Sequence, residues 1–170
     1  MSFLRRLIYG VLLSVLFFLG ALVVGLIEHR VPATLSLIGT SVVFEAQPAA
    51  VASLPLRLQP FSGALISILG NLIPIPILMF VFDEILNHWT WVRRRLQKAE
   101  TWSKKYGKYG VWVLIPLSPI LGAYVCIGVG YIMRWNSRLV LSSVLIGMVL
   151  SSFMITYGGE SLVRILRPYI

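Results

Sequence analysis

Three consecutive ionisable residues, Glu28, His29 and Arg30, directly follow a long apolar stretch. A charged group beside a membrane segment is costly, so such residues are the first candidates for function. The Glu28 carboxylate could carry a proton, and the planar guanidinium of Arg30 could bind a phosphate or carboxylate. The alternative is that both side chains lie in the headgroup layer as a weak ion pair or as anchors. His29 lies between them; an imidazole can carry a proton in the physiological range, but a single interfacial histidine usually has no such role.

A second group of candidates lies where prolines and glycines interrupt apolar sequence. Asn71 and Ser118 are hydrogen-bonding residues at two such interruptions. A proline frees a helix carbonyl, and transporter sites are built from such half-helix ends near the bilayer midplane. The breaks therefore indicate a substrate or ion pathway, with plain kinks, and Asn71 holding helices together, as the alternative. The expected break residues are Pro32, Gly70, Pro74, Pro76, Pro116, Pro119 and Gly122.

Enzymatic chemistry has little support in the sequence. It holds two histidines and one cysteine, Cys126, and no carboxylates at metal-ligand spacing. We therefore expect no enzyme, no metal and no cofactor. No Gly-rich nucleotide loop occurs, so transport would draw on an ion gradient rather than on ATP. Cys126 lies in an apolar run and is predicted to be a buried structural thiol.

The composition is that of a membrane protein. Of the 170 residues, 58% are hydrophobic and 12% charged, whereas soluble domains are about 45–50% apolar and about 25% charged. The length predicts a single domain, residues 1–170. Fifteen Lys and Arg against six Asp and Glu give a net charge of +9, which in a membrane protein serves to orient the chain.

Three apolar segments are long enough to cross a bilayer, namely 7–27, 61–82 and 139–159. The first is flanked by basic residues on its N-terminal side, and it covers the hydrocarbon core of about 30 Å. A cleaved signal peptide is the alternative for this segment, but its apolar run is longer than usual and lacks an A-x-A-like cleavage site. Central prolines predict that 61–82 is a broken span covered by protein or lining a water-filled cavity.

Two further segments, 28–50 and 111–133, are interpreted as re-entrant hairpins. The run Val31–Phe44 has the length of a segment that dips into the bilayer and returns. Residues 45–60, with several prolines, predict a surface linker. In the second hairpin, Pro116 and Pro119 predict the tip and leave arms of about 11 residues, or about 16 Å. A full span fits the length of 111–133 equally well.

Residues 83–110 predict an amphipathic helix on the cytoplasmic face, because tryptophans alternate there with arginines and lysines. The basic run 93–108 could recognise anionic lipid headgroups, but charge that only orients the chain explains it as well. Nucleic acid is not an expected partner, since this run lies between two membrane segments.

Charge counting places the N-terminus and the basic run in the cytoplasm. Hairpin 28–50 then enters from outside and hairpin 111–133 from inside, which is the layout of an inverted repeat. Small residues at four-residue spacing predict close helix packing against a hairpin or a second protomer, and a homodimer is a plausible arrangement because few spans enclose little volume. These residues are Gly122, Cys126 and Gly130, and Ser143, Gly147 and Ser151.

Four motifs occur in order along the chain: Glu28-His29-Arg30-Val31-Pro32, Gly70-Asn71 followed by Pro74 and Pro76, the tandem repeat 105–110, and the run from Ile115 to Tyr124. Together they resemble the bacterial and archaeal family called putative small multidrug export proteins, over nearly the whole chain. That family is similar to the DedA (VTT-domain, SNARE-associated) membrane proteins. The family usually reads Glu-x-Arg-Gly-Ala-Ile-Pro in the first motif, and Glu28, Arg30 and Pro32 keep this pattern at compressed spacing.

The resemblance implies an all-α protein of the prokaryotic cytoplasmic membrane with two opposed re-entrant hairpins. It implies a secondary transporter, proton-coupled through Glu28, that moves a lipid-like anion such as a polyprenyl phosphate. Arg30, Asn71, Ser118 and Tyr124 would bind this substrate. The alternatives are a small-molecule or multidrug exporter, and a non-transporting scaffold that binds lipid or a partner through 93–108. The expected partners are membrane lipids, the substrate and protons.

Overall fold

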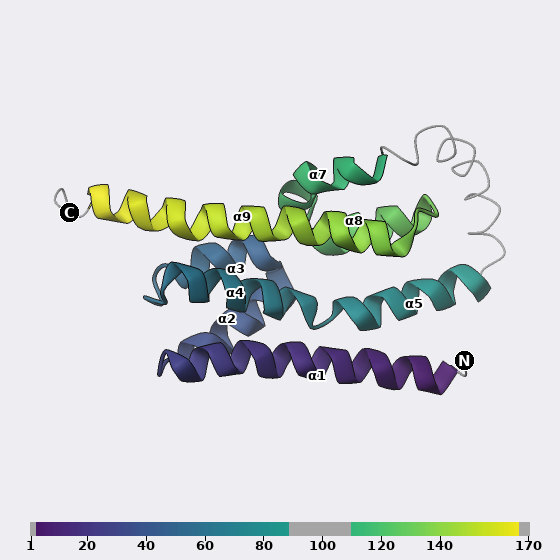
Figure 1. Cartoon of the computed structure of the whole chain (residues 1–170), viewed down its shortest axis with the longest axis horizontal. Helices are drawn as coiled ribbons and strands as arrows, with labels where there is room; N and C mark the ends of the chain where they lie inside the picture. The colour runs from purple at the N-terminus through teal and green to yellow at the C-terminus, as the bar shows by residue number, and fades with distance from the viewer. Residues whose placement is uncertain (1–2, 89–109, 167–170) are drawn as a thin grey trace. The chain divides into compact units, whose positions relative to one another are not determined.

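The structure is a computed structural model that describes residues 3–88 and 110–166, and all regular secondary structure in these residues is helical. The elements are α1 (Phe3–Ile27), α2 (Val31–Phe44), α3 (Ala46–Ser53), α4 (Pro60–Leu72), α5 (Ile75–His88), the short 3-10 helix η1 (Val111–Val113), α7 (Leu114–Leu121), α8 (Ala123–Ile132) and α9 (Ser137–Leu166), drawn in Figure 1. The predicted helix 83–110 and the basic run lie mostly outside the described residues, and 83–88 continue α5.

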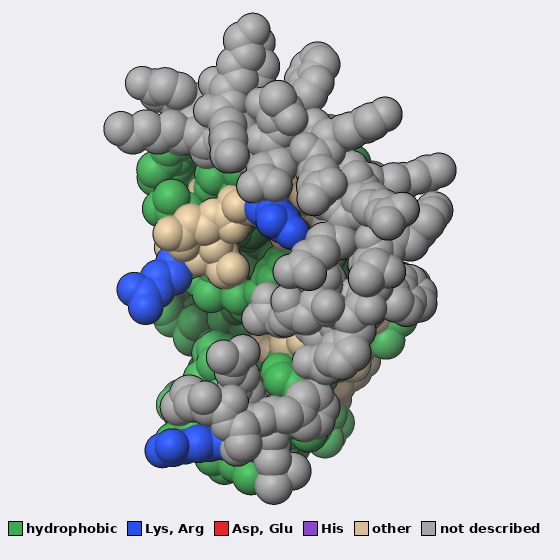
Figure 2. All heavy atoms as spheres, turned by 90° about the vertical axis from the view of Figure 1, so that its right-hand side faces the viewer, with side chains coloured by type: hydrophobic (Ala, Val, Ile, Leu, Met, Phe, Trp, Pro, Cys, Tyr) green, Lys and Arg blue, Asp and Glu red, His purple; other side chains and the backbone are tan. Residues whose placement is uncertain are grey.

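Three helical stretches are long and apolar enough to cross a membrane: Leu7–Ile27, Pro60–Phe82 and Ser137–Gly159. They match the three predicted spans to within two residues at each end. The prediction of an all-α membrane protein is therefore confirmed, and the chain is an integral membrane protein. The exposed surface of the described residues is consistent with a membrane environment, since many large apolar side chains of α1 are exposed. Among the coloured side chains in Figure 2, most are hydrophobic, and a few Lys or Arg side chains project.

The described chain divides into two compact units, and the long helices α1 and α9 contribute residues to both. Unit 1 comprises residues 1–10 and 75–148, and unit 2 comprises residues 11–74 and 149–170. Each unit contains two helices in close contact that are separated by a single residue. We call α2 with α3 the first helix pair, in unit 2, and α7 with α8 the second helix pair, in unit 1.

In unit 2, the first helix pair packs against α4, and the three helices lie together in Figure 1. Their shared core is built from small and aliphatic side chains of α1 to α4 and the loop before α4. Small residues set the spacing: a β-carbon on Gly25 would lie 2.6 Å from Thr34 Cβ, and one on Gly63 would lie 2.7 Å from Ser53 Cβ. Backbones approach this closely only where side chains are small, which is the usual packing of helices in membranes.

In unit 1, the second helix pair packs against α5 and α9. The rings of Phe82 on α5 and Tyr131 on α8 stack with centroids 5.7 Å apart. A β-carbon on Gly130 would lie 2.5 Å from Val140 Cγ1, so α8 and α9 are in close contact. The prediction that Gly130 and Gly147 serve helix packing is confirmed by these approaches, because Gly147 lies equally close to α7.

The prolines mostly mark helix starts rather than the predicted hairpin breaks. Pro32 lies in the first turn of α2. Backbone N–H groups in the first turn of a helix have no acceptor within the helix, so a proline there costs no hydrogen bond. The predicted break at Gly70 and Asn71 is wrong, because both lie within α4 and the helix ends only at Leu72. The break in this span is the turn at Ile73 and Pro74, and Pro76 is the second residue of α5.

The predicted surface linker 45–60 is also wrong in its first half. Residues 46–53 form α3, and Ala46, Gln47, Ala49, Ala50 and Ser53 are buried. The prolines that suggested a linker are compatible with this structure, since Pro48 lies in the first turn of α3 and Pro60 begins α4. Small side chains let α3 pack closely against α2 and α4, and the run Val31–Phe44 is one helix that does not itself turn back.

Candidate functional site

The two helix pairs turn at residues with the same rare backbone conformation. Glu45 has φ 73° and ψ 178°, and Gly122 has φ 90° and ψ 157°. This region of the Ramachandran plot is almost restricted to glycine, because a β-carbon makes unfavourable contacts there. The tip of the second pair is thus Gly122 rather than Pro116 and Pro119, which lie within α7.

Each helix pair also packs on the helix that follows it through one glycine. A β-carbon on Gly70 of α4 would lie 2.9 Å from Ser41 Cβ and 3.4 Å from Ile38 Cα. A β-carbon on Gly147 of α9 would overlap Ser118 Oγ and the carbonyl oxygen of Ile115. In both pairs the serine lies four residues before the tip, and the isoleucine three residues before the serine.

The turn that follows the second helix of each pair has the same backbone form. Arg57 and Arg134 both adopt the left-handed conformation, with φ 54° and 53°. Each N–H bonds the carbonyl three residues earlier, and the next residue's N–H bonds the carbonyl five residues earlier. This is the Schellman helix end, in which the left-handed position is usually glycine. Both arginine side chains are exposed.

Each position of the first helix pair named above lies 77 residues before its counterpart in the second pair, and no insertion or deletion is needed to align them. Over the segment from the start of α2 to the end of α4, the residues that are identical at this offset are Leu37 and Leu114, Ile38 and Ile115, Ser41 and Ser118, Ala46 and Ala123, Arg57 and Arg134, and Gly70 and Gly147. The contact of Ser53 with Gly63 likewise corresponds to that of Gly130 with Val140. The chain therefore contains an internal structural repeat, centred on the two helix pairs.

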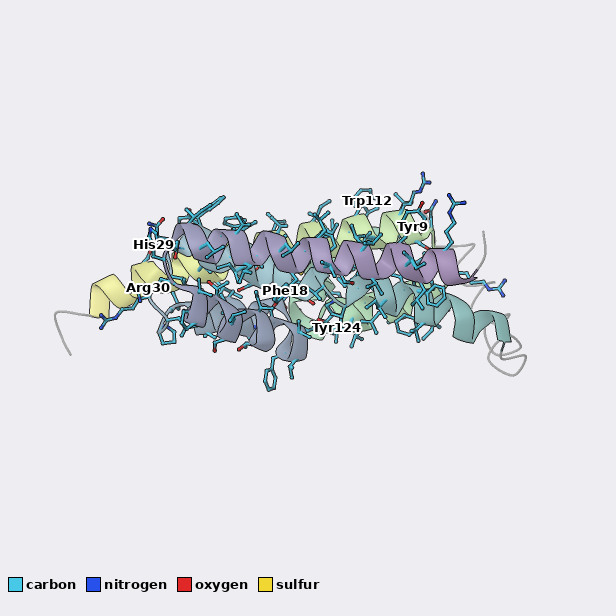
Figure 3. All side chains as sticks on the ribbon, turned by 90° about the horizontal axis from the view of Figure 1, so that it is seen from below. Tyr9, Phe18, His29, Arg30, Trp112 and Tyr124 are labelled. Atoms are coloured by element: carbon cyan, nitrogen blue, oxygen red, sulfur yellow. The ribbon has the colours of Figure 1, made fainter. Side chains whose placement is uncertain are left out.

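Glu28, His29 and Arg30 form the end of α1. His29 is the left-handed residue of a third Schellman end, with φ 54°, so its backbone has a capping role. Glu28 is half-buried, and its Oε1 is buried with no hydrogen-bond partner among residues 3–88 and 110–166. Arg30 is exposed, and its carbonyl accepts hydrogen bonds from the N–H and Oγ1 of Thr34. Figure 3 shows His29 and Arg30 together at this helix end.

The predicted polar ligands lie on different elements. Asn71 is fully buried on α4, Ser118 is fully buried on α7, and Tyr124 is half-buried in the first turn of α8. Ser118 has a structural role, because Pro119 cannot donate to the Ile115 carbonyl and the Ser118 hydroxyl donates to it instead, at 3.2 Å. Within unit 1, Ser118 is brought together with Gly147.

Further buried polar side chains connect the first helix pair to its neighbours in unit 2. The Ser41 hydroxyl donates to the Ser67 carbonyl of α4. Gln47, two residues after the tip, donates from Nε2 to Ser151 Oγ of α9 at 3.3 Å. Ser152, next to Ser151, is fully buried, and its Oγ has no hydrogen-bond partner in the described structure. Hydrogen bonds of Ser41 and Gln47, on either side of the tip, therefore connect the first helix pair to α4 and α9 within unit 2.

Sequence reasoning missed Glu45 as a candidate, although a signal for it existed. Comparing the sequence with itself at an offset of 77 residues aligns Glu45 with Gly122 within a series of identities. An acidic residue at the position of a turn glycine is the kind of local inconsistency that marks functional sites.

The chain matches the model of a known protein family. The model of the family described as putative small multi-drug export protein matches residues 45–154, more than half of the chain. No curated protein and no solved structure matches. The match begins at Glu45, so the residues taken as the family's first motif, Glu28 to Pro32, lie outside it, whereas both helix-pair tips, Gly70, Asn71 and the run from Ile115 to Tyr124 lie inside. On this match, the chain belongs to the putative small multi-drug export protein family.

Proposed function

We propose that the protein is a small secondary transporter, proton-coupled, that moves a lipid-like anionic substrate such as a polyprenyl phosphate. The observation that carries the proposal is the repeated helix pair, with its rare backbone turn, next to helices long enough to span a membrane. Secondary transporters are commonly built from internal repeats with interrupted helices whose ends bind substrate or ions.

The anionic substrate class is supported by where arginines lie around the helix pairs. Arg30 directly precedes α2, Arg57 lies in the turn after α3, and Arg134 lies in the turn after α8. All three are exposed, and a guanidinium binds phosphate through paired hydrogen bonds. The N-terminus of α2, next to Arg30, adds the favourable end of a helix dipole.

Proton coupling is proposed to involve Glu28. This role is supported by the position of Glu28 at the base of the first helix pair and by its buried Oε1, which accepts no hydrogen bond from any residue that the structure describes. The DedA-like arrangement of two opposed re-entrant hairpins is part of the same proposal, with the first helix pair entering from outside and the second from the cytoplasm. The N-terminus is then cytoplasmic.

Transport by purified protein in proteoliposomes tests the function directly. With an imposed proton gradient, we expect polyprenyl phosphate to move faster than without one, and this gradient dependence to be lost in Glu28→Gln. Arg30→Ala is expected to raise the substrate concentration needed for half-maximal rate, because one anion contact is removed. If neither polyprenyl phosphate nor a cationic dye moves in folded protein, a non-transporting scaffold replaces the proposal.

Export of small molecules is the second candidate, and the family description favours it. A pocket for cationic drugs needs apolar and aromatic walls but no arginine. In the same proteoliposomes, movement of the cationic dye that is unchanged in Arg30→Ala would select this alternative over lipid-phosphate transport.

The re-entrant arrangement makes a separate prediction for thiol labelling. In a Cys126→Ala background, Arg30→Cys and Arg57→Cys are expected to react with a membrane-impermeant maleimide from the same side. Trp112→Cys and Arg134→Cys, at the two ends of the second pair, are expected to react from the opposite side. Each of these positions is exposed. Labelling of Arg30→Cys and Arg57→Cys from different sides would show that the first helix pair spans the bilayer instead.

A further inference from the structure

We infer that α9 separates from α3 and α4 during transport, and that the polar side chains uncovered there, Ser152 among them, bind the headgroup of the substrate. The inference rests on the proposed transport of a lipid-like anion and assigns that substrate a binding site within unit 2. We call this site the polar interface. It consists of Gln47 and Ser53 on α3 and Ser151, Ser152 and Thr156 on α9, all of which are buried.

Contacts within unit 2 bring these side chains to one interface. Gln47 Nε2 donates to Ser151 Oγ at 3.3 Å, which joins α3 to α9. Further along both helices, a β-carbon on Gly63 of α4 would lie 2.6 Å from Ser53 Oγ and 3.8 Å from Thr156 Cγ2. The helices α3, α4 and α9 therefore meet along this part of α9, and polar side chains of two of them lie where they meet.

Hydrogen bonds within the closed interface satisfy four of its five side chains and not Ser152. The Ser53 hydroxyl donates to the Ala50 carbonyl at 2.7 Å, and the Thr156 hydroxyl donates to the Ser152 carbonyl at 3.0 Å. The Ser152 side chain lies one helical turn before Thr156 on the same face of α9 and is fully buried. Its Oγ has no hydrogen-bond partner in residues 3–88 or 110–166. This unmade bond destabilises the closed interface, and the hydroxyl regains it on meeting a polar group.

The chemistry of the polar interface suits a headgroup that has to bind and then leave. Its side chains are hydroxyls and one amide, which can donate hydrogen bonds to phosphate oxygens. No Lys, Arg, Asp or Glu occurs in α3 or α4, so these two helices offer no ion pair that would retain the anion. Conduction requires binding that is favourable enough for entry and weak enough for release.

Aromatic rings beside the polar interface suit the apolar chain of the same substrate. Phe153 and Tyr157, each the next residue after a hydroxyl of the polar interface, have ring centroids 6.2 Å apart. The ring of Phe61 on α4 lies 5.8 Å from that of Phe153. Phe61 and Tyr157 are exposed. Hydrogen-bonding groups and an apolar surface therefore lie next to each other, as an amphipathic lipid phosphate requires.

Thiol labelling tests whether the interface opens. In detergent-solubilised protein with Cys126→Ala, Ser152→Cys is expected to react with 2-aminoethyl methanethiosulfonate, because opening exposes the thiol to water. Saturating polyprenyl phosphate is expected to abolish this labelling. Val51→Cys, on the exposed side of α3, is the control that reacts with and without the lipid. The native Cys126, fully buried in unit 1, is the control that does not react.

Ser152→Ala tests the cost of the closed interface. Alanine removes the hydroxyl that lacks a partner there, so the variant is expected to melt about 2–4 °C higher than the wild type. It is also expected to transport polyprenyl phosphate more slowly, since the closed state is more stable and the open state has lost a donor. Ser53→Ala is the matched control: its hydroxyl has the Ala50 carbonyl as acceptor, so this variant should not melt higher.

Labelling of Ser152→Cys that the lipid prevents, together with the raised melting temperature of Ser152→Ala, would support the inference. It would be overturned if Ser152→Cys were as unreactive as Cys126, or if polyprenyl phosphate left the labelling unchanged. A melting temperature that Ser152→Ala leaves unchanged or lowers would also overturn it. If the wild type transports nothing but the lipid still prevents labelling, the proposed function fails and the headgroup site remains.

Discussion

Gly147→Leu is expected to be among the most destabilising substitutions in the chain, by about 3 kcal/mol or more. The new side chain would overlap Ser118 Oγ and the Ile115 carbonyl, and a backbone carbonyl cannot move aside as a flexible side chain can. The second helix pair would therefore lose its packing on α9. Thermal unfolding in detergent and the elution profile on a sizing column measure this effect.

The matched control is Gly158→Leu on the same helix, where a β-carbon meets nothing within 4 Å and the residue is exposed. Its effect is expected to stay within about 0.5 kcal/mol. The repeat predicts that Gly70→Leu, which meets Ser41 and Ile38, destabilises unit 2 in the same direction as Gly147→Leu. Equal melting temperatures for Gly147→Leu and Gly158→Leu would contradict the packing.

The second large effect is expected for Gly122→Ala. At φ 90° and ψ 157° a β-carbon costs about 1–3 kcal/mol. Gly39→Ala is its control, because Gly39 lies inside α2 with open space around it. There alanine is expected to stabilise the protein by about 0.5–1 kcal/mol, since glycine weakens a helix interior. The two substitutions should therefore shift the melting temperature in opposite directions, and a shift in the same direction would argue against the tip conformation.

The long helices could be predicted because their signal is distributed over many residues. An apolar stretch long enough to cross a bilayer is recognised from the hydrophobicity of about 20 residues together. One polar or atypical residue in the stretch therefore does not prevent its recognition. The spans 7–27, 61–82 and 139–159 were located on this basis. The small residues Gly130 and Gly147 were likewise recognisable from spacing alone, because close helix packing requires them.

The helix-pair tips could not be located in this way. The tip of the second pair was predicted at Pro116 and Pro119, which in fact lie within α7. The helix continues through Pro119 because the Ser118 hydroxyl donates to the Ile115 carbonyl, to which Pro119 has no N–H to donate. The residue types next to Glu45 do not predict a turn with positive φ at this position. The position of the turn is fixed by tertiary packing of α2 and α3 on α4, which a single sequence does not display. The family match then placed the tip inside the family region and Glu28 outside it.

The two arms of the first helix pair differ in length, and this has a mechanical consequence for the surrounding lipid. The α3 arm has 8 residues, about 12 Å of helix, whereas α2 extends about 21 Å. In the proposed re-entrant arrangement, lipid chains beside α3 meet less apolar helix than those beside α2. A bilayer accommodates such a mismatch by local thinning, at a modest elastic cost for each ångström. The protein would thus deform its own leaflet unevenly, and its activity would depend on the acyl-chain length of the host membrane.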